Sequence, residues 1–312
     1  MTRNFSLGSR DMVFAGEIAL KRSALLGEIG HTAVADISGR WGIFVTFAKQ
    51  EGINRMEHID GELVCKYGHG LAEEVESDEI AASRAQDLVS AVNSVMSRAT
   101  KSRWQIISPT RDCGIPQRCR IREIPPVGID RAELEIALES MRIAGTPRTA
   151  SVAELSRKLG LRSREGSLLD ARAALAEAIT DRVITVRHGT KGGKIRVVPI
   201  TSSTQVAALE RAAKTQGNGR NLIPPGQSYK DWRYGELRVG REILKTAGFT
   251  GYHELRAAYA CQRYHELSNQ LAPVIARHVV DRVADKVARK TISTELGHGR
   301  IDVVAEYIGG RK

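Results

Sequence analysis

A segment rich in proline and arginine, at positions 108–130, divides the sequence into two stretches. Repeated proline blocks helix formation, and arginine keeps a segment in water and attracts anions. We therefore predict a linker at 108–129 between two domains, since a chain of 312 residues is long enough for two cores. The linker either crosses a nucleic-acid backbone or is only a solvated connector. Its prolines and arginines are Pro109, Pro116, Pro125, Pro126, Arg111, Arg118, Arg120 and Arg122.

The first stretch shows the apolar spacing of a small helical bundle. We place this helical domain at 31–107. Positions 1–30 show no sustained period, so we predict an arm there with a short helix near 15–26. The three helical stripes of the bundle lie at 34–48, 63–75 and 79–99.

The second stretch, 130–312, combines helical spacing with one short region of period two. Asp130 is placed to cap a first helix, and Gly160 to end another. Two β-branched runs flank a glycine-rich loop at 188–194, which is typical of a hairpin. We therefore predict a fold that is mainly α with a small antiparallel β-sheet. The expected helices include 131–142, 151–159 and 163–179, and the expected strands are 183–187 and 195–200.

Positive charge is spread along the whole chain. The 47 Lys and Arg residues against 36 Asp and Glu give a net charge of +11 and a pI near 9.7. A spread excess favours binding to a long polyanion, with solubility as the alternative. No apolar run reaches the ~18 residues of a membrane span, and the N-terminus lacks the pattern of a secretory signal. We expect a cytoplasmic, nucleoid-associated protein.

The four cysteines are few and scattered along the chain. Cys113 and Cys119 are separated by five residues, which is not the spacing of a zinc knuckle, and no second pair lies nearby. We therefore expect reduced thiols, no metal site and no cofactor.

Charged and polar residues recur in a pattern that suits the binding of one phosphodiester. Arg162 and Glu165 are i,i+3 neighbours, so the carboxylate can hold the guanidinium. Lys191 stands on the glycine-rich loop. His253 and Arg256 share one face of a helix rich in small and apolar residues, where an arginine needs an anionic partner or a polar pocket.

The last part of the pattern is a Leu-Gly-His segment ending at His298, followed nine positions later by Tyr307. Taken alone, Tyr307 belongs to an apolar stripe and would be a core residue. A tyrosine that follows two arginines, a lysine and two histidines instead provides what phosphoryl transfer to a phenol oxygen requires.

This order of motifs resembles the tyrosine recombinase (phage integrase) family. The resemblance rests on a Gly-Leu-Arg-x-x-Glu box at 160–165, a Gly-Thr-Lys-Gly loop at 189–192 and an Arg-x-Val-Pro strand at 196–199. It rests also on His253-x-x-Arg256 and on the step from His298 to Tyr307. The motifs cover about 150–308, so the resemblance implies a tyrosine recombinase catalytic domain at 130–312. The bundle at 31–107 is similar to the core-binding domain of the family, and the two domains would close around DNA as a C-shaped clamp.

The resemblance implies a role for each residue of the pattern. Arg162 and Arg256 would bind the two non-bridging oxygens of the scissile phosphate, with His298 as a further hydrogen-bond donor. Tyr307 would attack phosphorus and form a 3′-phosphotyrosyl link. His253 is the candidate proton acceptor for the phenol, and Lys191 would protonate the leaving 5′-oxygen. Glu165 would orient Arg162 or His253.

The implied function is site-specific DNA recombination, without metal or ATP, for integration or excision of a mobile element. The partners would be double-stranded DNA, further copies of the chain in a tetramer on two DNA sites, and an accessory DNA-bending or directionality protein. Two alternatives are DNA relaxation of the type IB topoisomerase kind and a non-catalytic DNA-binding protein with this fold. The candidate DNA contacts are Arg118, Arg120, Arg122, Lys194 and Arg196.

Three features depart from the pattern of the family. Arg164 lies two residues from Arg162 and competes for its role. The segment at about 264–290 is longer than expected; it is basic and would be a helix that contacts DNA or protein, or is only solvated. Few residues follow Tyr307, so we expect its placement to depend on DNA or on a neighbouring subunit.

Overall fold

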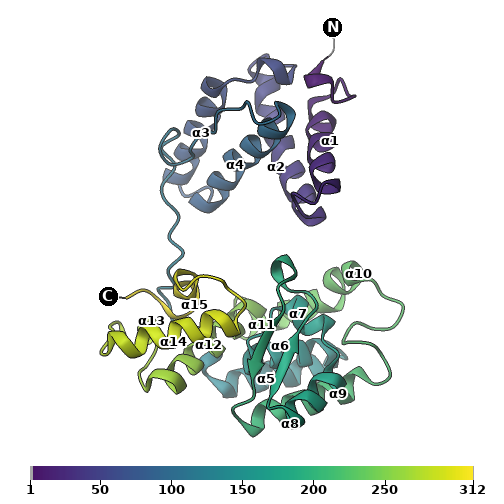
Figure 1. Ribbon diagram of the computed structural model, residues 1–312, viewed down its shortest axis with the longest axis vertical. Coiled ribbons are helices and arrows are strands. Elements are labelled where there is room, and N and C mark those ends of the chain that lie inside the picture. The colour runs from purple at the N-terminus through teal and green to yellow at the C-terminus, as the bar shows by residue number, and fades with distance from the viewer. Residues whose placement is uncertain (1–2, 312) are drawn as a thin grey trace. The chain divides into compact units, whose positions relative to one another are not determined.

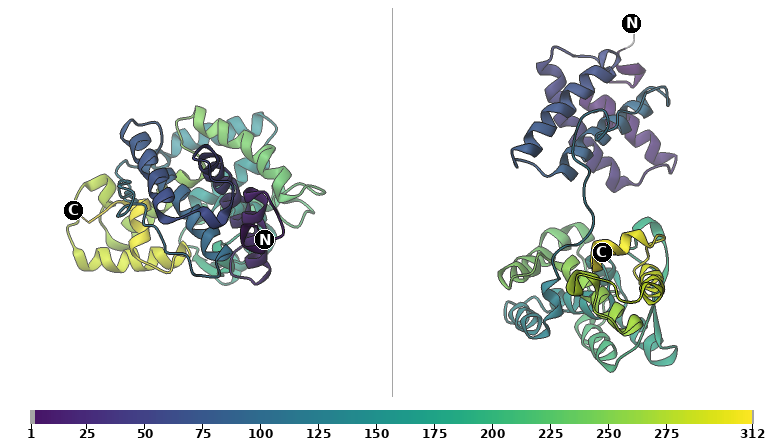
Figure 2. Two further views of the ribbon diagram at one scale, coloured as in Figure 1. Left: turned by 90° about the horizontal axis from the view of Figure 1, so that it is seen from above. Right: turned by 90° about the vertical axis from the view of Figure 1, so that its left-hand side faces the viewer.

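The computed structural model describes residues 3–311 and divides into two compact units, one ending at Cys119 and the other beginning at Arg120. Each unit has its own hydrophobic core. Figure 1 shows the course of the chain, and Figure 2 shows the helices of each unit from two further directions. No helix among residues 3–311 is long and apolar enough to cross a membrane.

The first unit is a bundle of helices around an aromatic core. Trp41, Phe44 and Tyr67 stack in sequence at its centre, with ring centroids 5.5 Å and 5.2 Å apart. The indole nitrogen of Trp41 donates to the carbonyl of Met12 at 2.8 Å, which joins the first helix to the second. The elements are η1 (Asn4–Ser6), α1 (Met12–Leu25), α2 (His31–Gln50), η2 (Met56–His58), α3 (Gly61–Glu76) and α4 (Ala82–Ala99).

The structure replaces the arm expected at 1–30 with an integral helix of this bundle. Asp11 caps α1 by accepting from the backbone of Val13 and Phe14, and Met12, Ala15, Ala19 and Leu20 are buried. Helix α1 packs against α2 and α4. The short helix predicted near 15–26 is therefore present as α1, but it belongs to the bundle and not to an arm.

The proline-rich segment is attached to a unit at each end. Ile107, Cys113 and Ile115 are buried in the first core, and the side chain of Asn93 bonds both backbone groups of Ile107. Further along, the backbone nitrogen of Arg122 donates to the carbonyl of Ala305 at 2.9 Å, within the second unit. The segment predicted as a linker at 108–129 therefore begins packed on the first unit and ends packed on the second, with many exposed residues between.

The second unit is mainly helical, with one two-stranded antiparallel sheet, which confirms the predicted fold class. The strands pair from Val183 opposite Pro199 to Val186 opposite Arg196. The elements before α12 are η3 (Val127–Ile129), α5 (Arg131–Ile143), α6 (Pro147–Leu159), α7 (Ser163–Leu168), α8 (Ala171–Thr180), β1 (Val183–Val186), η4 (Lys191–Gly193), β2 (Arg196–Pro199), α9 (Ser203–Gln216), α10 (Tyr229–Tyr234) and α11 (Glu236–Thr246). The remaining elements are α12 (Tyr252–Ser268), α13 (Pro273–Ala276), α14 (Arg282–Glu295), η5 (Asp302–Val304) and α15 (Ala305–Ile308).

Helix α12 is the central helix of this unit. It packs against α6, α14 and α15 (Figure 1). Leu255, Ala257, Ala258 and Ala260 are buried, and these mostly small side chains let neighbouring helices approach closely. A polar residue on α12 is therefore held rigidly between several elements.

Two helix predictions need correction. The helix expected at 163–179 is two helices, because Leu169 is extended and the Asp170 carboxylate caps α8 by accepting from two backbone nitrogens. The helix expected across 264–290 is the end of α12, the short α13 and the first part of α14. Within that segment Tyr264 and Arg289 are buried and both bond Asp285, so its interior face belongs to the core.

Candidate active site

Arg256 is fully buried, with no exposed surface. Its guanidinium donates to the carbonyls of Gly160 and Leu296, which end α6 and α14. Burial lowers the pKa of Arg256 to about 10, so the group still carries its charge at neutral pH. Arg256 thus joins three segments that are distant in the sequence, as a buried arginine must in order to satisfy its donors.

Glu165 is fully buried and gathers the arginines of the site. Its carboxylate accepts from Nη1 of Arg162 at 2.6 Å and from Nη2 of Arg196 at 2.6 Å, and it lies 3.7 Å from Nη1 of Arg256. Burial alone would raise the pKa of this carboxyl, but Arg196 and Arg256 outweigh burial and hold the pKa below its ordinary value. The carboxylate is therefore ionised and fixes the positions of two of the proposed phosphate-binding groups.

Tyr307 lies inside this cluster and is only 2% exposed. Its hydroxyl oxygen is 3.0 Å from Nε2 of His298 and accepts from Nε of Arg256 at 3.4 Å. The turn after α14 fixes His298, because its backbone nitrogen donates to the carbonyl of Ser293 at 2.8 Å. The hydroxyl of Ser293 in turn donates to the carbonyl of His298. The phenol oxygen is thus placed between a histidine and an arginine.

Both histidines of the pattern are neutral at pH 7. Burial and the guanidinium groups of Arg256 and Arg162 lower the pKa of His298 to about 4. Burial and the same two arginines lower the pKa of His253 to about 4, although part of this ring is exposed to solvent. The His253 ring stacks beside Tyr307, with centroids 5.2 Å apart. A neutral imidazole can accept a proton, and a phosphate arriving among these cations would favour its charged form.

Lys191 lies on the exposed loop between β1 and β2. It is close enough to contribute, after burial, Arg256 and Arg162, to the lowered pKa of His298. The loop therefore brings a second type of cation to the edge of the cluster, where the lysine side chain is free to meet a ligand.

The structure brings the six predicted catalytic residues and Glu165 together from five segments of the chain. Arg164 is not part of this cluster, because its guanidinium lies over the ring of Tyr229, 5.1 Å from the centroid. Arg162 is therefore the arginine that joins the site. The six predicted catalytic residues are Arg162, Lys191, His253, Arg256, His298 and Tyr307.

Tyr307 is in place within a single chain, contrary to the expectation that its position depends on DNA or on a neighbour. The carbonyl of Gly309 accepts from Nη2 of Arg289 at 3.1 Å. Arg311 binds Asp285 at 2.7 Å, and Asp285 also accepts from Arg289. These contacts hold the chain that follows α15 and so help to fix the phenol.

The candidate DNA contacts differ in how freely their charge meets solvent. Lys194 is exposed. Arg120 is half exposed and lies 3.8 Å from a Glu306 oxygen, and Arg118, in the first unit, lies 3.5 Å from Asp87. These pairs are long and leave the guanidinium groups able to bind phosphate.

Arg122 and Arg196 are instead engaged within the protein. Arg122 donates to Glu254 at 2.9 Å and to the carbonyl of Ile124, with 19% of its side chain exposed. Arg196 is buried, with 3% of its side chain exposed, so we no longer include it among the surface residues available to DNA. The alternation of side chains along a strand could have predicted this burial, because Arg196 lies on the same face of β2 as Val198, which points into the core.

The residues 3–311 contain no group of three or more His, Cys, Asp or Glu side chains placed to hold a metal ion. The four cysteines are free thiols. The cluster at Tyr307 is made of cations and neutral rings around one carboxylate, which is a donor set suited to an anion.

One family profile matches part of this chain, and several solved structures share its fold. The profile of the family described as "Integrase" matches residues 122–262, which covers α5 to most of α12. A comparison with curated proteins finds no match. The Tn1549 transposon integrase, solved in complex with transposon right end DNA, aligns with a TM-score of 0.60 and 11% identity over 95% of each chain.

Two further solved structures give similar values. The XerH site-specific recombinase, in a post-cleavage complex with a palindromic difH substrate, has a TM-score of 0.59 and 15% identity over 96% of this chain and 82% of that one. A lambda integrase tetramer bound to a Holliday junction has a TM-score of 0.54 and 16% identity over 94% of this chain and 78% of that one.

The second unit has the fold of a tyrosine recombinase catalytic domain. The "Integrase" profile matches 122–262 within this unit and the solved structures share its fold, so the predicted resemblance is confirmed.

Proposed function

We propose that this protein is a site-specific DNA recombinase that cleaves and rejoins DNA through a 3′-phosphotyrosyl intermediate. The observation that carries the proposal is the placement of the Tyr307 hydroxyl, which is bound by both His298 and Arg256 within one chain. A core tyrosine would need no such pair of partners beside a second arginine and an ionised glutamate.

The proposed reaction exchanges one phosphodiester bond for another. Arg162 and Arg256 bind the non-bridging oxygens of the scissile phosphate and neutralise the charge that grows in the transition state. The oxygen of Tyr307 forms a bond to phosphorus while the bond to the 5′-oxygen of the next nucleotide breaks. Lys191 gives a proton to that leaving oxygen. Attack by a 5′-hydroxyl then releases the tyrosine and reseals a strand.

The proton of the Tyr307 phenol needs an acceptor, since phenol has an ordinary pKa of about 10. From the sequence we assigned this role to His253. The geometry favours His298 in the DNA-free protein, because its Nε2 lies at hydrogen-bond distance from the phenol oxygen, whereas His253 contacts the ring. We therefore propose His298 as the first partner of this proton and His253 as a group that shapes the field around it.

The proposed chemistry uses neither ATP nor a metal ion. The phosphotyrosyl bond keeps the energy of the original phosphodiester, so rejoining requires no further energy source. The charge of the transition state is met by two guanidinium groups and a lysine. Adduct formation in the presence of a metal chelator, at the rate seen without it, supports this part of the proposal, and loss of adduct contradicts it.

Binding to duplex DNA would come mainly from lysine and arginine contacts to phosphate, so affinity would fall steeply with salt. Arg118, Arg120 and Lys194 are the candidates whose charge faces solvent. Lambda integrase has been solved as a tetramer on a Holliday junction, and we propose a tetramer on two DNA sites here. The Tn1549 transposon integrase supports a task in the integration or excision of a mobile element.

A suicide substrate tests the chemistry, because a nick near the cut site lets the released fragment diffuse away and traps the covalent adduct. The wild-type protein should form the adduct with DNA from the borders of the element that encodes it. The absence of an adduct despite binding would overturn the enzymatic proposal and favour a DNA-binding protein. Relaxation of a supercoiled plasmid that lacks the target site would favour a topoisomerase instead.

A further inference from the structure

Arg196 occupies an unusual position for a strand arginine. It stands at the start of β2, five residues after Lys191, and its side chain points into the protein. Its guanidinium donates to the carboxylate of Glu165 at 2.6 Å, to the carbonyl of Gly160 at 3.4 Å and to the carbonyl of Glu295. Gly160 and Glu165 flank Arg162, and Glu295 lies three residues before His298. Arg196 therefore contacts two of the segments that form the site directly and reaches Arg256 through Glu165.

The fit of Arg196 against the turn before His298 is close. Gly297 has φ +69°, and a Cβ added there would lie 2.7 Å from Cδ of Arg196. The stem of Arg196 therefore fills the space that a side chain at Gly297 would need. One nitrogen, Nε, is buried without a partner among the described residues. A buried donor without a partner costs free energy, so the other contacts of Arg196 must offset that cost.

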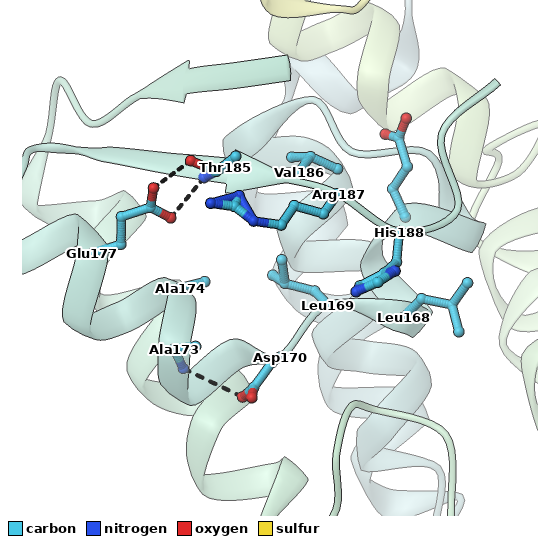
Figure 3. Close-up of a pocket in the computed structure, with 11 residues that line it drawn as sticks. Leu168, Leu169, Asp170, Ala173, Ala174, Glu177, Thr185, Val186, Arg187 and His188 are labelled. Carbon is cyan, nitrogen blue, oxygen red and sulfur yellow. Dashed lines mark hydrogen bonds between the residues drawn. The ribbon is translucent and has the colours of Figure 1, made fainter. Parts of the chain in front are cut away.

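The hairpin that carries Lys191 packs Ile184, Val186 and Val198 into the core but has few other polar attachments. Within the described residues, side-chain hydrogen bonds from 183–199 to the rest of the unit come from Thr185, which bonds Glu177, and from Arg196. Beside β1 lies a cavity of about 300 Å³, lined in part by Thr185, Arg187, His188 and Leu169 (Figure 3). The hairpin is thus poorly packed on that side, and Thr185 holds it on β1 while Arg196 holds it at the end nearest Lys191.

The phosphate-binding group, in contrast, has contacts that do not need Arg196. Glu165 keeps Arg162, and the carbonyl of Gly160 keeps Arg256. The Glu295 side chain is bound by Tyr259 and Arg263. Loss of Arg196 would therefore free the hairpin more than it would disturb the arginines.

We propose that Arg196 is a positioning residue that couples the Lys191 loop to the phosphate-binding arginines, so that the lysine meets the 5′-oxygen of the phosphate they hold. This role rests on the proposed function. It acts on one step only, the protonation of the leaving oxygen, and a general acid in this position contributes on the order of 10²- to 10⁴-fold in rate.

Two suicide substrates that differ in one bridging atom test this role. One carries the normal 5′-oxygen at the cut, and the other carries sulfur in its place. A thiol has an ordinary pKa of about 8.5 and leaves as thiolate without a proton, whereas an alkoxide needs the acid. Wild-type protein, Lys191→Ala, Arg162→Ala and Arg196→Met are compared on both substrates at saturating protein.

We expect Arg196→Met to slow adduct formation on the oxygen substrate on the order of 10²-fold. On the sulfur substrate its rate should come within about tenfold of the wild-type rate, and Lys191→Ala should behave in the same way. Arg162→Ala should be slow on both. Arg196→Lys keeps the charge but reaches fewer acceptors, so it should show the same rescue by sulfur with a smaller loss. If thermal unfolding shows that Arg196→Met does not fold, Arg196→Lys replaces it in this comparison.

Two results would overturn the role of Arg196 alone, while wild-type protein still forms the adduct. One is an equal loss for the Arg196 variants on both substrates, which indicates a part in phosphate binding or folding. The other is wild-type rates for both variants on the oxygen substrate. Failure of the wild-type protein on both substrates would instead overturn the proposed function together with this role.

Discussion

Nε2 of His298 lies 3.0 Å from the hydroxyl oxygen of Tyr307, and both residues belong to the same chain. The same nitrogen is 3.4 Å from Nη2 of Arg256, so a cation stands directly beside the pair. This arrangement keeps the imidazole neutral and leaves it able to accept the phenol proton. It also means that the DNA-free protein already holds its nucleophile among the groups that would bind phosphate.

The lowered pKa of His298 predicts how stability depends on pH. The unfolded chain takes up this proton near the ordinary value of 6.5, but the folded protein takes it up only near 4. Between these values acid favours the unfolded state, so the contribution of His298 to the free energy of unfolding falls as pH drops from 6.5 to 4. Urea denaturation at pH 7 and pH 5 should show a smaller loss for His298→Asn than for wild type, and an equal loss in the two proteins contradicts the buried, neutral histidine.

Glu165 acts in a different pH range. Its folded pKa is held below the ordinary 4.5, so its contribution is present above pH 4.5 and is lost as pH falls through the folded value. Glu165→Gln leaves Arg162, Arg196 and Arg256 without their shared anion and should destabilise the protein at pH 7 by about 3–5 kcal/mol. The difference between variant and wild type should shrink below pH 4.5 in the same denaturation assay. A difference that does not change with pH would show that Glu165 is not ionised in the folded protein.

Substitution of the two proposed phosphate-binding arginines should change the free energy of unfolding by different amounts but lower the rate of adduct formation to a similar extent. Arg256→Ala leaves buried carbonyls and Glu165 unsatisfied and should cost about 3–5 kcal/mol. Arg162 is 22% exposed and Glu165 keeps other partners, so Arg162→Ala should cost only about 1–2 kcal/mol. Both should lower the rate of adduct formation on the order of 10²- to 10³-fold. Arg164→Ala is the matched control, since Arg164 lies over Tyr229, and a comparable rate loss there would contradict the assignment of Arg162.

The chain after Tyr307 should be sensitive to a single methyl group. Gly309 has φ +88°, and an added Cβ would lie 2.8 Å from the backbone nitrogen of Val274. Gly309→Ala should therefore cost about 1–3 kcal/mol and displace α15, and a displacement near 1 Å lowers rates by up to ~10²-fold. Adduct yield and thermal unfolding measure the two effects.

Gly226→Ala is the control for Gly309→Ala, because Gly226 has φ +81° with no atom within 4 Å of an added Cβ. It should share the backbone strain but keep the wild-type rate of adduct formation. If both variants react equally slowly, the effect is a general loss of stability and the tail does not position Tyr307.

The sequence singled out the candidate catalytic residues because several of them follow a spacing rule. His253 and Arg256 share a helix face by i,i+3 spacing, and Gly160 marks the turn before Arg162. The packing of Arg196 was missed because a strand arginine after a basic loop suggests solvent, and only its alternation with Val198 indicated the opposite. Which arginine Glu165 binds is a matter of tertiary distance, which spacing along the chain does not contain.

The termini of the elements were predicted less well for a physical reason. Apolar periodicity runs through Leu168 and Leu169 without a break, so it does not reveal that the Asp170 side chain starts a new helix. Tyr307 was expected to need a neighbour because so few residues follow it. Its fixed position depends on Asp285 and Arg289 in α14, a helix that the sequence pattern suggested was only solvated or a contact for a partner.

The most direct measurement is the identity of the residue that carries DNA in the trapped adduct. Trypsin cuts after Arg300 and Arg311, and the peptide 301–311 contains Tyr307 and no serine, threonine or second tyrosine. After nuclease digestion, mass spectrometry should find a nucleotide 3′-phosphate on this peptide for wild type and no adduct for Tyr307→Phe. A nucleotide on any other peptide, or an adduct that survives in Tyr307→Phe, would contradict the central claim that Tyr307 is the nucleophile.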